Sequence, residues 1–150
     1  MAELAHPADA PVVGESETEI DASPEVVWNV LTGIERWPTW NPDVKSVSMQ
    51  GSVAEGSTFR WKAGPGTIKS TIQHVEPPKL ISWTGTTFGI KAFHVYVLEQ
   101  RGPKTFVKTT ESYDGLVARL FRGQLKKTLD RALLDGIQNL KAEAERRSEQ

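Results

Sequence analysis

The strongest constraint on this chain is a change of hydrophobic period near Leu116. From there to about Arg147, apolar residues recur at helical spacing as one stripe: Leu116, Leu120, Leu125, Leu129, Leu133, Ile137 and Leu140. A helix of that length spans about 45 Å, enough to cross a whole domain. Gly123, near its start, is a point where the helix can kink. A single helix this long requires a large apolar surface to pack against.

The preceding residues supply that surface as a series of short strands. The period-two pattern from Val12 to Ile20 predicts a first strand with one wet face. Six further strands, separated by Gly- and Pro-containing turns, are predicted at residues 44–49, 57–62, 67–75, 80–85, 91–100 and 105–113. Such short connections join antiparallel neighbours, so the strands form a meander. Between the first two strands, Ser23 and Pro24 predict a helix start, Gly33 its end, and residues 35–42 a brief helical turn.

Length and composition narrow the class of protein. The 150 residues suit one domain at residues 12–150, after a disordered leader at 1–11. The 18 basic and 19 acidic side chains leave a net charge of -1, which predicts neither a nucleic-acid partner nor a polybasic lipid anchor. The chain has no cysteine, no metal-ligand spacing, no signal peptide and no apolar run long enough for stable membrane insertion. We therefore expect a cytoplasmic protein without metal or cofactor.

Five segments, in this order, resemble one superfamily. They are Ile20-Asp-Ala-Ser-Pro-Glu-Val-Val-Trp28, Trp37-Pro-Thr-Trp-Asn-Pro42, Pro78-Lys-Leu-Ile-Ser-Trp83, His94-Val-Tyr-Val-Leu-Glu99 and Thr109-Thr-Glu-Ser-Tyr-Asp-Gly115. Together they resemble the START-like (SRPBCC) superfamily, and within it the polyketide cyclase/dehydrase and lipid-transport group. The resemblance implies an α+β helix-grip fold: seven antiparallel strands wrapped around a long C-terminal helix, with two short helices between strands 1 and 2. It implies no single activity, because members include cyclases, carriers and receptors.

Strand parity predicts which side chains face a ligand pocket between sheet and helix. The predicted ligand-binding set is Trp40, Phe59, Trp61, Ile72, His74, Trp83, Phe88, Tyr96, Tyr113, Leu125, Leu129, Ala132 and Leu133. Thr128, Ala132 and Gly136 are small and spaced by four, which either leaves room beneath the sheet or allows close helix–sheet packing. The loops at 63–66 and 86–89 are either gates of the pocket, with Phe88 as a lid, or ordinary hairpin turns.

The strand at 91–100 is apolar on both faces, so parity alone does not orient it. The resemblance favours His94 and Tyr96 inward, leaving an outer patch of Phe93, Val95, Val97 and Phe106 for a partner or a homodimer. The alternative is a strand buried on both faces. Pairing through the turn at Gly102 would bring His94 opposite Thr109 or Glu111.

His94 and Glu111 are the candidate catalytic residues. A buried His–Glu pair is able to act as a general base or to orient a ligand hydroxyl, and the alternative is a structural hydrogen bond. Three functions follow from these patterns. The first is a carrier or sensor that binds a small apolar or aromatic ligand resembling a lipid, polyketide or quinone. The second is a metal-free cyclase or dehydratase, and the third is a protein-interaction module that uses the outer patch.

Overall fold

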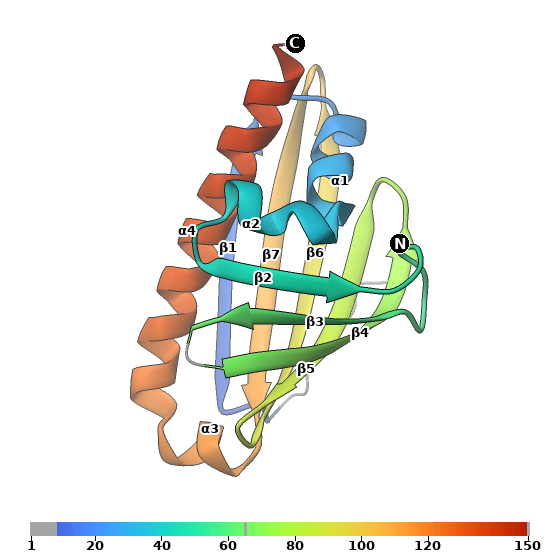
Figure 1. The fold of residues 1–150 in the computed structure, drawn as a ribbon. Helices are drawn as coiled ribbons and strands as arrows, with labels where there is room; N and C mark the ends of the chain where they lie inside the picture. The colour runs from blue at the N-terminus through green and yellow to red at the C-terminus, as the bar shows by residue number, and fades with distance from the viewer. Residues whose placement is uncertain (1–8, 65, 150) are drawn as a thin grey trace.

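The computed structural model describes residues 9–64 and 66–149 and has the helix-grip fold that the sequence predicts (Figure 1). Its elements run in the order β1 (Val12–Ile20), α1 (Pro24–Thr32), η1 (Ile34–Arg36), α2 (Trp37–Trp40), β2 (Val44–Met49), β3 (Thr58–Ala63), β4 (Gly66–Glu76), β5 (Leu80–Thr87), β6 (Ile90–Arg101), β7 (Lys104–Asp114), α3 (Leu116–Leu120) and α4 (Arg122–Ser148). Most of the predicted leader, residues 1–8, lies outside the described residues.

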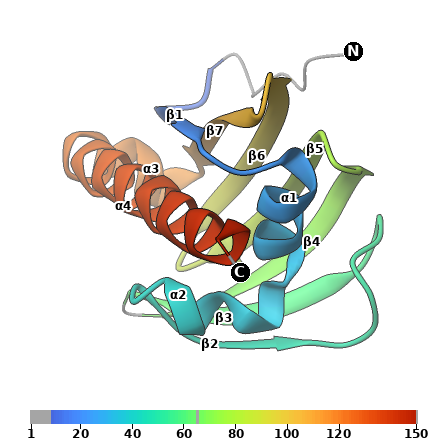
Figure 2. The same ribbon diagram turned by 90° about the horizontal axis from the view of Figure 1, so that it is seen from above.

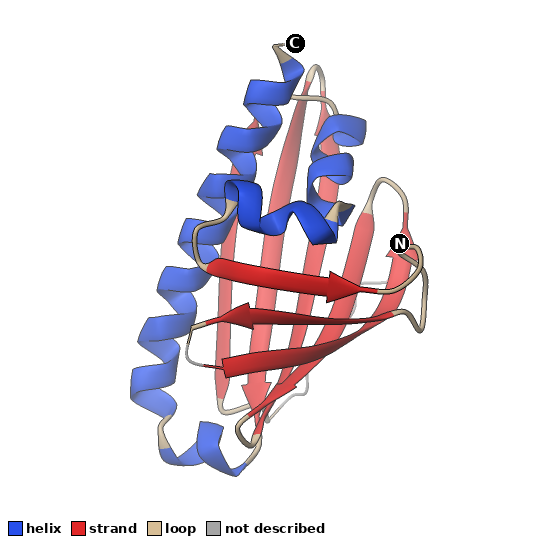
Figure 3. Cartoon of the chain, viewed as in Figure 1, coloured by secondary structure: helices blue, strands red, loops and turns tan. Residues whose placement is uncertain are grey.

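The seven strands form one antiparallel sheet. Their order is β1-β7-β6-β5-β4-β3-β2, so the first strand returns to pair with the last. Seen from above, the sheet curves around α4, and α1 and α2 lie on the same concave side (Figure 2). Figure 3 shows the same division into one sheet and the helices that it encloses. The interior therefore lies between the concave face of the sheet and these helices.

Local sequence explains the first helix. The Ser23 side chain accepts a hydrogen bond from the Val26 backbone N–H at 3.3 Å, and Pro24 occupies the first helical position. Val27, Val30 and Leu31 form the buried face of α1. Its C-terminal end is followed by the short η1 and α2, which replace the single brief turn predicted there.

The long C-terminal helix differs from its prediction at its start. Residues 116–148 form two helices, because Phe121 leaves the helical region with φ -116° and ψ 35°. The break lies at Phe121 and not at Gly123. Leu116 and Leu120 consequently leave the predicted core stripe and are 70% and 68% exposed. The remaining apolar stripe, from Leu129 to Ala144, is buried.

One flank of α4 is fixed to the edge strand β1. A Cβ added at Gly14 would lie 3.1 Å from a Leu133 methyl group, so glycine permits the close approach of helix and strand. The ammonium groups of Lys126 and Lys141 donate to the backbone carbonyls of Val13 and Glu19, each at 2.8 Å. These bonds satisfy edge carbonyls that would otherwise be open to pairing with another chain.

The interior contains two apolar clusters. The larger lies under α1 and α2 and is centred on Trp37, whose ring centroid is 5.4–5.6 Å from those of Phe59, Trp61 and Trp83. The smaller joins β1, α3 and α4 through Val12, Ala118, Leu129 and Leu133. Within the described ranges, every helix is too short or too polar to cross a lipid bilayer.

Candidate functional site

His94 and Glu111 lie opposite each other on β6 and β7, on the concave face of the sheet. The His94 Nδ1 is 3.5 Å from the Glu111 Oε1. The two side chains are 10% and 15% exposed, so both are largely buried yet still reachable by solvent-sized molecules. The predicted pairing of His94 with this part of β7 is confirmed, and so is the inward orientation of the His94 face.

Thr109 and Tyr96 extend this pair into a network. The His94 Nε2 is 2.7 Å from the Thr109 hydroxyl oxygen, and Thr109 also hydrogen-bonds to the Tyr96 phenol, which lies opposite it in the sheet. When Thr109 donates to Tyr96, it accepts from the His94 Nε2–H. The His94 Nδ1 is then an acceptor that faces Glu111, an arrangement in which a protonated Glu111 is stabilised.

Burial controls the protonation of this network. Desolvation raises the pKa of Glu111 to about 8, because the low-dielectric interior disfavours the carboxylate. Burial also raises the pKa values of Tyr96 and Tyr113, and a charged Glu111 raises them further. At neutral pH the network therefore holds a neutral carboxylic acid beside an imidazole, which together are able to donate and accept one proton.

Aromatic side chains form the wall beside this network. The Trp83 ring centroid lies 4.9 Å from that of His94 and 5.8 Å from that of Tyr96. The predicted residues Phe59, Trp61 and Ile72 also point inward, but they pack with Trp37 as a filled cluster at the end of the interior covered by α1 and α2. Any ligand space near His94 must therefore extend away from that cluster.

The opposite wall of the site comes from α4 and β7. Leu129 and Leu133 are buried against β1, with Leu125 and Tyr113 half-buried beside them. A Cβ at Gly136 would lie 4.0 Å from the Tyr96 hydroxyl, which places this flank of α4 over the polar network. Ala132, one turn earlier, is exposed. Thr128, a further turn earlier, is exposed as well, so that space for a ligand along this flank of α4 stays a prediction.

His74 is a correction to the predicted inward set. Strand β4 has a bulge between Ile72 and His74, which pair with Trp83 and Ser82 of β5. The extra residue, Gln73, reverses the alternation, so His74 is exposed and the half-buried Val75 packs against the core instead. The prediction that inward side chains alternate strictly along residues 67–75 was therefore wrong after Ile72.

The outer patch predicted on β6 is not an open apolar surface. Val95 is 5% exposed, and Phe93 and Val97 are half-buried. The guanidinium of Arg101 lies 4.0 Å above the half-buried Phe106 ring. Strand β6 is therefore largely buried on both faces, as the alternative interpretation of residues 91–100 predicted. A homodimer through this face stays a prediction.

The remaining predicted residues lie at the two ends of the interior. Trp40, in α2, is half-buried against the larger cluster. Phe88 is 70% exposed in the β5–β6 turn, where its ring contacts Gly66 at the start of β4. The two loops predicted as gates therefore touch, although Pro65 lies outside the described residues. Whether they open and close stays a prediction.

Sequence reasoning missed the role of Trp37, the ring at the centre of the larger cluster. Its indole N–H donates to the Leu31 carbonyl at 2.9 Å, which fixes α2 against α1. The tryptophan-rich segment 37–42 was a visible signal, yet Trp37 follows no strand or helix period that would assign it a face.

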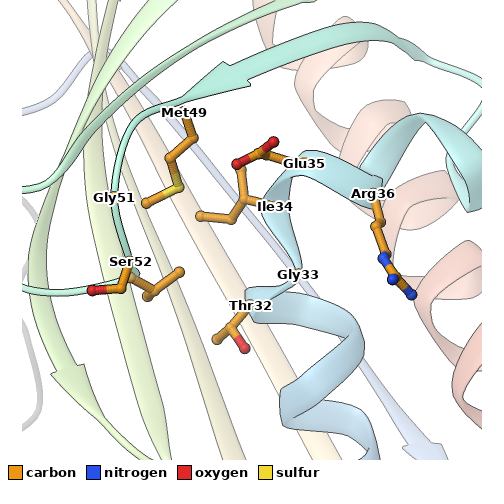
Figure 4. A pocket seen from close by; sticks show the side chains of 9 residues that line it. Thr32, Gly33, Ile34, Glu35, Arg36, Met49, Gly51 and Ser52 are labelled. Atoms are coloured by element: carbon orange, nitrogen blue, oxygen red, sulfur yellow. The ribbon is translucent and has the colours of Figure 1, made fainter.

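A separate surface groove of about 350 Å³ lies outside the concave site (Figure 4). It is open and is lined by the end of α1, η1, the end of β2 and the β2–β3 connection, with the residues Thr32, Gly33, Ile34, Glu35, Arg36, Met49, Gly51, Ser52 and Val53. None of the predicted site residues contributes to it. In the part of the chain that the structure describes, no three metal-ligating side chains converge.

Several solved structures share this architecture. A hypothetical protein, jhp0584, from Helicobacter pylori aligns with a TM-score of 0.83 at 13% identity, over 96% of this chain and 97% of its own. The Zhui aromatase/cyclase from Streptomyces sp. R1128 aligns with a TM-score of 0.79 at 15% identity, over 90% of this chain and 94% of its own.

The di-domain aromatase/cyclase StfQ of the steffimycin biosynthetic pathway aligns with a TM-score of 0.76 at 15% identity, over 93% of this chain and 53% of its own. At such identities these likenesses establish the fold alone. No curated protein matches the chain in sequence. The family model described as polyketide cyclase/dehydrase and lipid transport matches residues 12–145, so the chain belongs to that family.

Proposed function

We propose that this protein binds a small apolar or aromatic ligand between the concave face of the sheet and α4, as a carrier or sensor. The observation that carries the proposal is a compact polar network, His94 with Glu111 and Thr109, set in an otherwise apolar wall. Binding sites for small organic molecules combine such walls with a few placed polar groups. Family membership supports the same class of function.

The two parts of the wall have different tasks in this proposal. Trp83 and Tyr96, stacked with their centroids 5.8 Å apart on neighbouring strands, supply the aromatic part of the wall that an apolar ligand would contact. Glu111, whose pKa is raised to about 8, is neutral at pH 7 and is able to donate a hydrogen bond to a ligand carbonyl or hydroxyl. A neutral donor suits an uncharged ligand, since no charge has to be buried with it.

Native mass spectrometry of freshly purified protein, with solvent extraction of bound molecules, tests the proposal directly. A matched pair of variants locates the site. Ala132→Phe places a ring on the α4 flank that carries Gly136, whereas Ala142→Phe places it at another exposed position of α4. We expect A132F to lose the copurifying ligand and A142F to keep it. Equal retention by both variants, or no bound molecule together with no thermal shift across a panel of hydrophobic ligands, would contradict the proposal.

A second candidate function, a cyclase or dehydratase, is favoured by the protonation of Glu111 beside His94. A neutral carboxylic acid next to an imidazole acceptor is able to protonate a ligand oxygen while the imidazole removes a proton from carbon or oxygen. The Zhui and StfQ proteins, named as aromatase/cyclases, share the fold. Glu111→Gln keeps the shape and removes the proton donor. With polyketide-like substrates, we expect E111Q to bind but to lose turnover, and an unchanged turnover would exclude Glu111 as the acid.

A further inference from the structure

Four large apolar side chains are exposed together at the end of the molecule where α3 lies. They are Phe88, Leu116, Leu120 and Phe121, with exposures of 70%, 70%, 68% and 57%, and we call them the rim patch. The β5–β6 turn and α3 are in contact, because a Cβ at Gly89 would lie 3.0 Å from a Val117 methyl group. Figure 1 shows α3 and this turn side by side below the sheet.

Packing within this domain gives no reason for large apolar side chains at the rim patch positions. On α3, Ala118 is the fully buried residue, and Leu116 and Leu120, spaced by four, share a face that points to solvent. Phe88 has a φ of 43°, a left-handed conformation that is unfavourable for a bulky side chain. Polar side chains at these positions would expose less apolar surface to water at a lower free energy. The patch therefore has the character of a contact surface.

The charges around the rim patch are mostly positive. Arg122 and Lys127, at the start of α4, are exposed. Lys126 is also exposed and is paired with Asp130 at 2.8 Å. Arg119 lies 3.7 Å from Asp114 and 3.8 Å from Asp9. Asp9, Asp114 and Asp130 thus pair with Arg119 and Lys126, and among the described residues Arg122 and Lys127 are the two positive charges at the rim that no acidic side chain offsets.

We propose that the rim patch docks reversibly on the surface of a lipid bilayer that contains anionic lipids. Exposed phenylalanine and leucine side chains enter the boundary between headgroups and acyl chains, and flanking lysine and arginine side chains bind the anionic headgroups. The earlier expectation of no lipid anchor rested on the net charge of the chain, which does not show where Arg122 and Lys127 lie relative to the rim patch. Such docking requires no membrane-spanning helix. It goes beyond the proposed ligand binding, because the rim patch would dock whether or not a ligand occupies the site.

Vesicle co-sedimentation tests the proposal with the intact chain. We expect the protein to bind vesicles of phosphatidylcholine mixed with phosphatidylglycerol, to bind pure phosphatidylcholine vesicles weakly, and to dissociate as salt is raised. The double variant Leu116→Ser/Leu120→Ser should lower the partition coefficient about tenfold or more. Arg122→Gln/Lys127→Gln should lower it by about fivefold per charge, and only for the anionic vesicles.

Matched control variants test whether the loss of any exposed apolar or basic side chain weakens vesicle binding, or only the loss of those in and beside the rim patch. Leu134→Ser removes a leucine that is 52% exposed on α4 outside the rim patch, and Lys45→Gln/Arg60→Gln removes two exposed charges from β2 and β3. Both controls should bind vesicles like the unmodified chain, and near-ultraviolet circular dichroism should show the same fold for every variant. The proposal is overturned by equal binding to both vesicle types, by equal losses in control and patch variants, or by patch variants that lose self-association in sedimentation velocity but not vesicle binding.

Discussion

His94 and Glu111 face each other across β6 and β7 with their nearest nitrogen and oxygen atoms 3.5 Å apart, on the buried side of the sheet. Desolvation raises the pKa of the Glu111 carboxyl group to about 8, because burial disfavours the charged carboxylate. The protonation of Glu111 should therefore govern both the stability and the chemistry of the site.

Glu111 should make stability decrease as the pH rises. Its pKa is about 8 in the folded chain and 4.5 without burial, so the folded state binds the proton more tightly. The stability that Glu111 contributes is therefore fully present below pH 4.5 and is lost progressively as the pH rises through about 8. We expect Glu111→Gln to match the unmodified chain at low pH and to be more stable above pH 8 by about 1–3 kcal/mol. Urea unfolding across this range measures the difference, and parallel curves would contradict the assignment.

Glu143 should show the opposite pH dependence. Hydrogen bonds from Arg146 and Arg147 and the charges of both lower its pKa to about 2, so its contribution is present at neutral pH and is lost as the pH falls below 4.5. Glu143→Gln should cost about 0.5–1 kcal/mol at pH 7, since the pair is near the surface, and almost nothing near pH 2. Urea unfolding of E111Q and E143Q at pH 7 should give differences of opposite sign from the unmodified chain, and both differences should nearly vanish near pH 2.

Thr109 should stabilise the network through its hydroxyl. It is fully buried, and its oxygen is 2.7 Å from the His94 Nε2. Thr109→Val keeps the shape but leaves an imidazole nitrogen without that partner, which should cost about 1–3 kcal/mol. Thr110→Val, on the other face of β7, is the control and should change stability little. NMR of the histidine ring should also show a changed tautomer population in T109V alone.

Two glycines at contrasting positions should respond oppositely to alanine. At Gly14 the new Cβ would lie 2.9 Å from the Asp130 carboxylate and close to Leu129 and Leu133, so these side chains must move from their packed positions. Gly123→Ala meets nothing within 4 Å and lies in the first turn of α4. We expect Gly14→Ala to destabilise by about 1–2 kcal/mol and Gly123→Ala to stabilise by about 0.5–1 kcal/mol. Thermal unfolding of the two variants provides the check, and a stabilised G14A would show that the approach is not tight.

Relief of the left-handed conformation at Phe88 should be stabilising. Phe88 and Gly89 have φ values of 43° and 73°, as in a two-residue hairpin turn that favours Asn followed by Gly. Phe88→Asn should raise the free energy of unfolding by about 1 kcal/mol, because asparagine tolerates this conformation. Phe88→Ala, which removes the ring but keeps the unfavourable φ, should not. Equal stability of the two variants would mean that asparagine relieves no strain here, and a loss of stability in both would mean that ring contacts with Gly66 outweigh the strain.

The sequence by itself determined the fold class and part of the site. Regular alternation in β3 placed Phe59 and Trp61 inward, and the short turn at Gly102 narrowed the partner of His94 on β7 to Thr109 or Glu111, of which the structure pairs it with Glu111. These features depend on local period and loop length, which each segment carries in its own residues. For the same reason, the capped helix α1 and the buried part of α4 were predictable.

The tertiary structure alone decided the exceptions. The bulge at Gln73 turned His74 outward, because a bulge is defined by pairing with β5 and leaves no trace in the period of β4 itself. Strand β6 is apolar on both faces, so only the packing of Trp83 and Tyr96 beside His94 fixed its orientation. The break that exposes Leu116 and Leu120 lies at Phe121, which is no helix-breaking residue, and α3 on its N-terminal side packs against the β5–β6 turn.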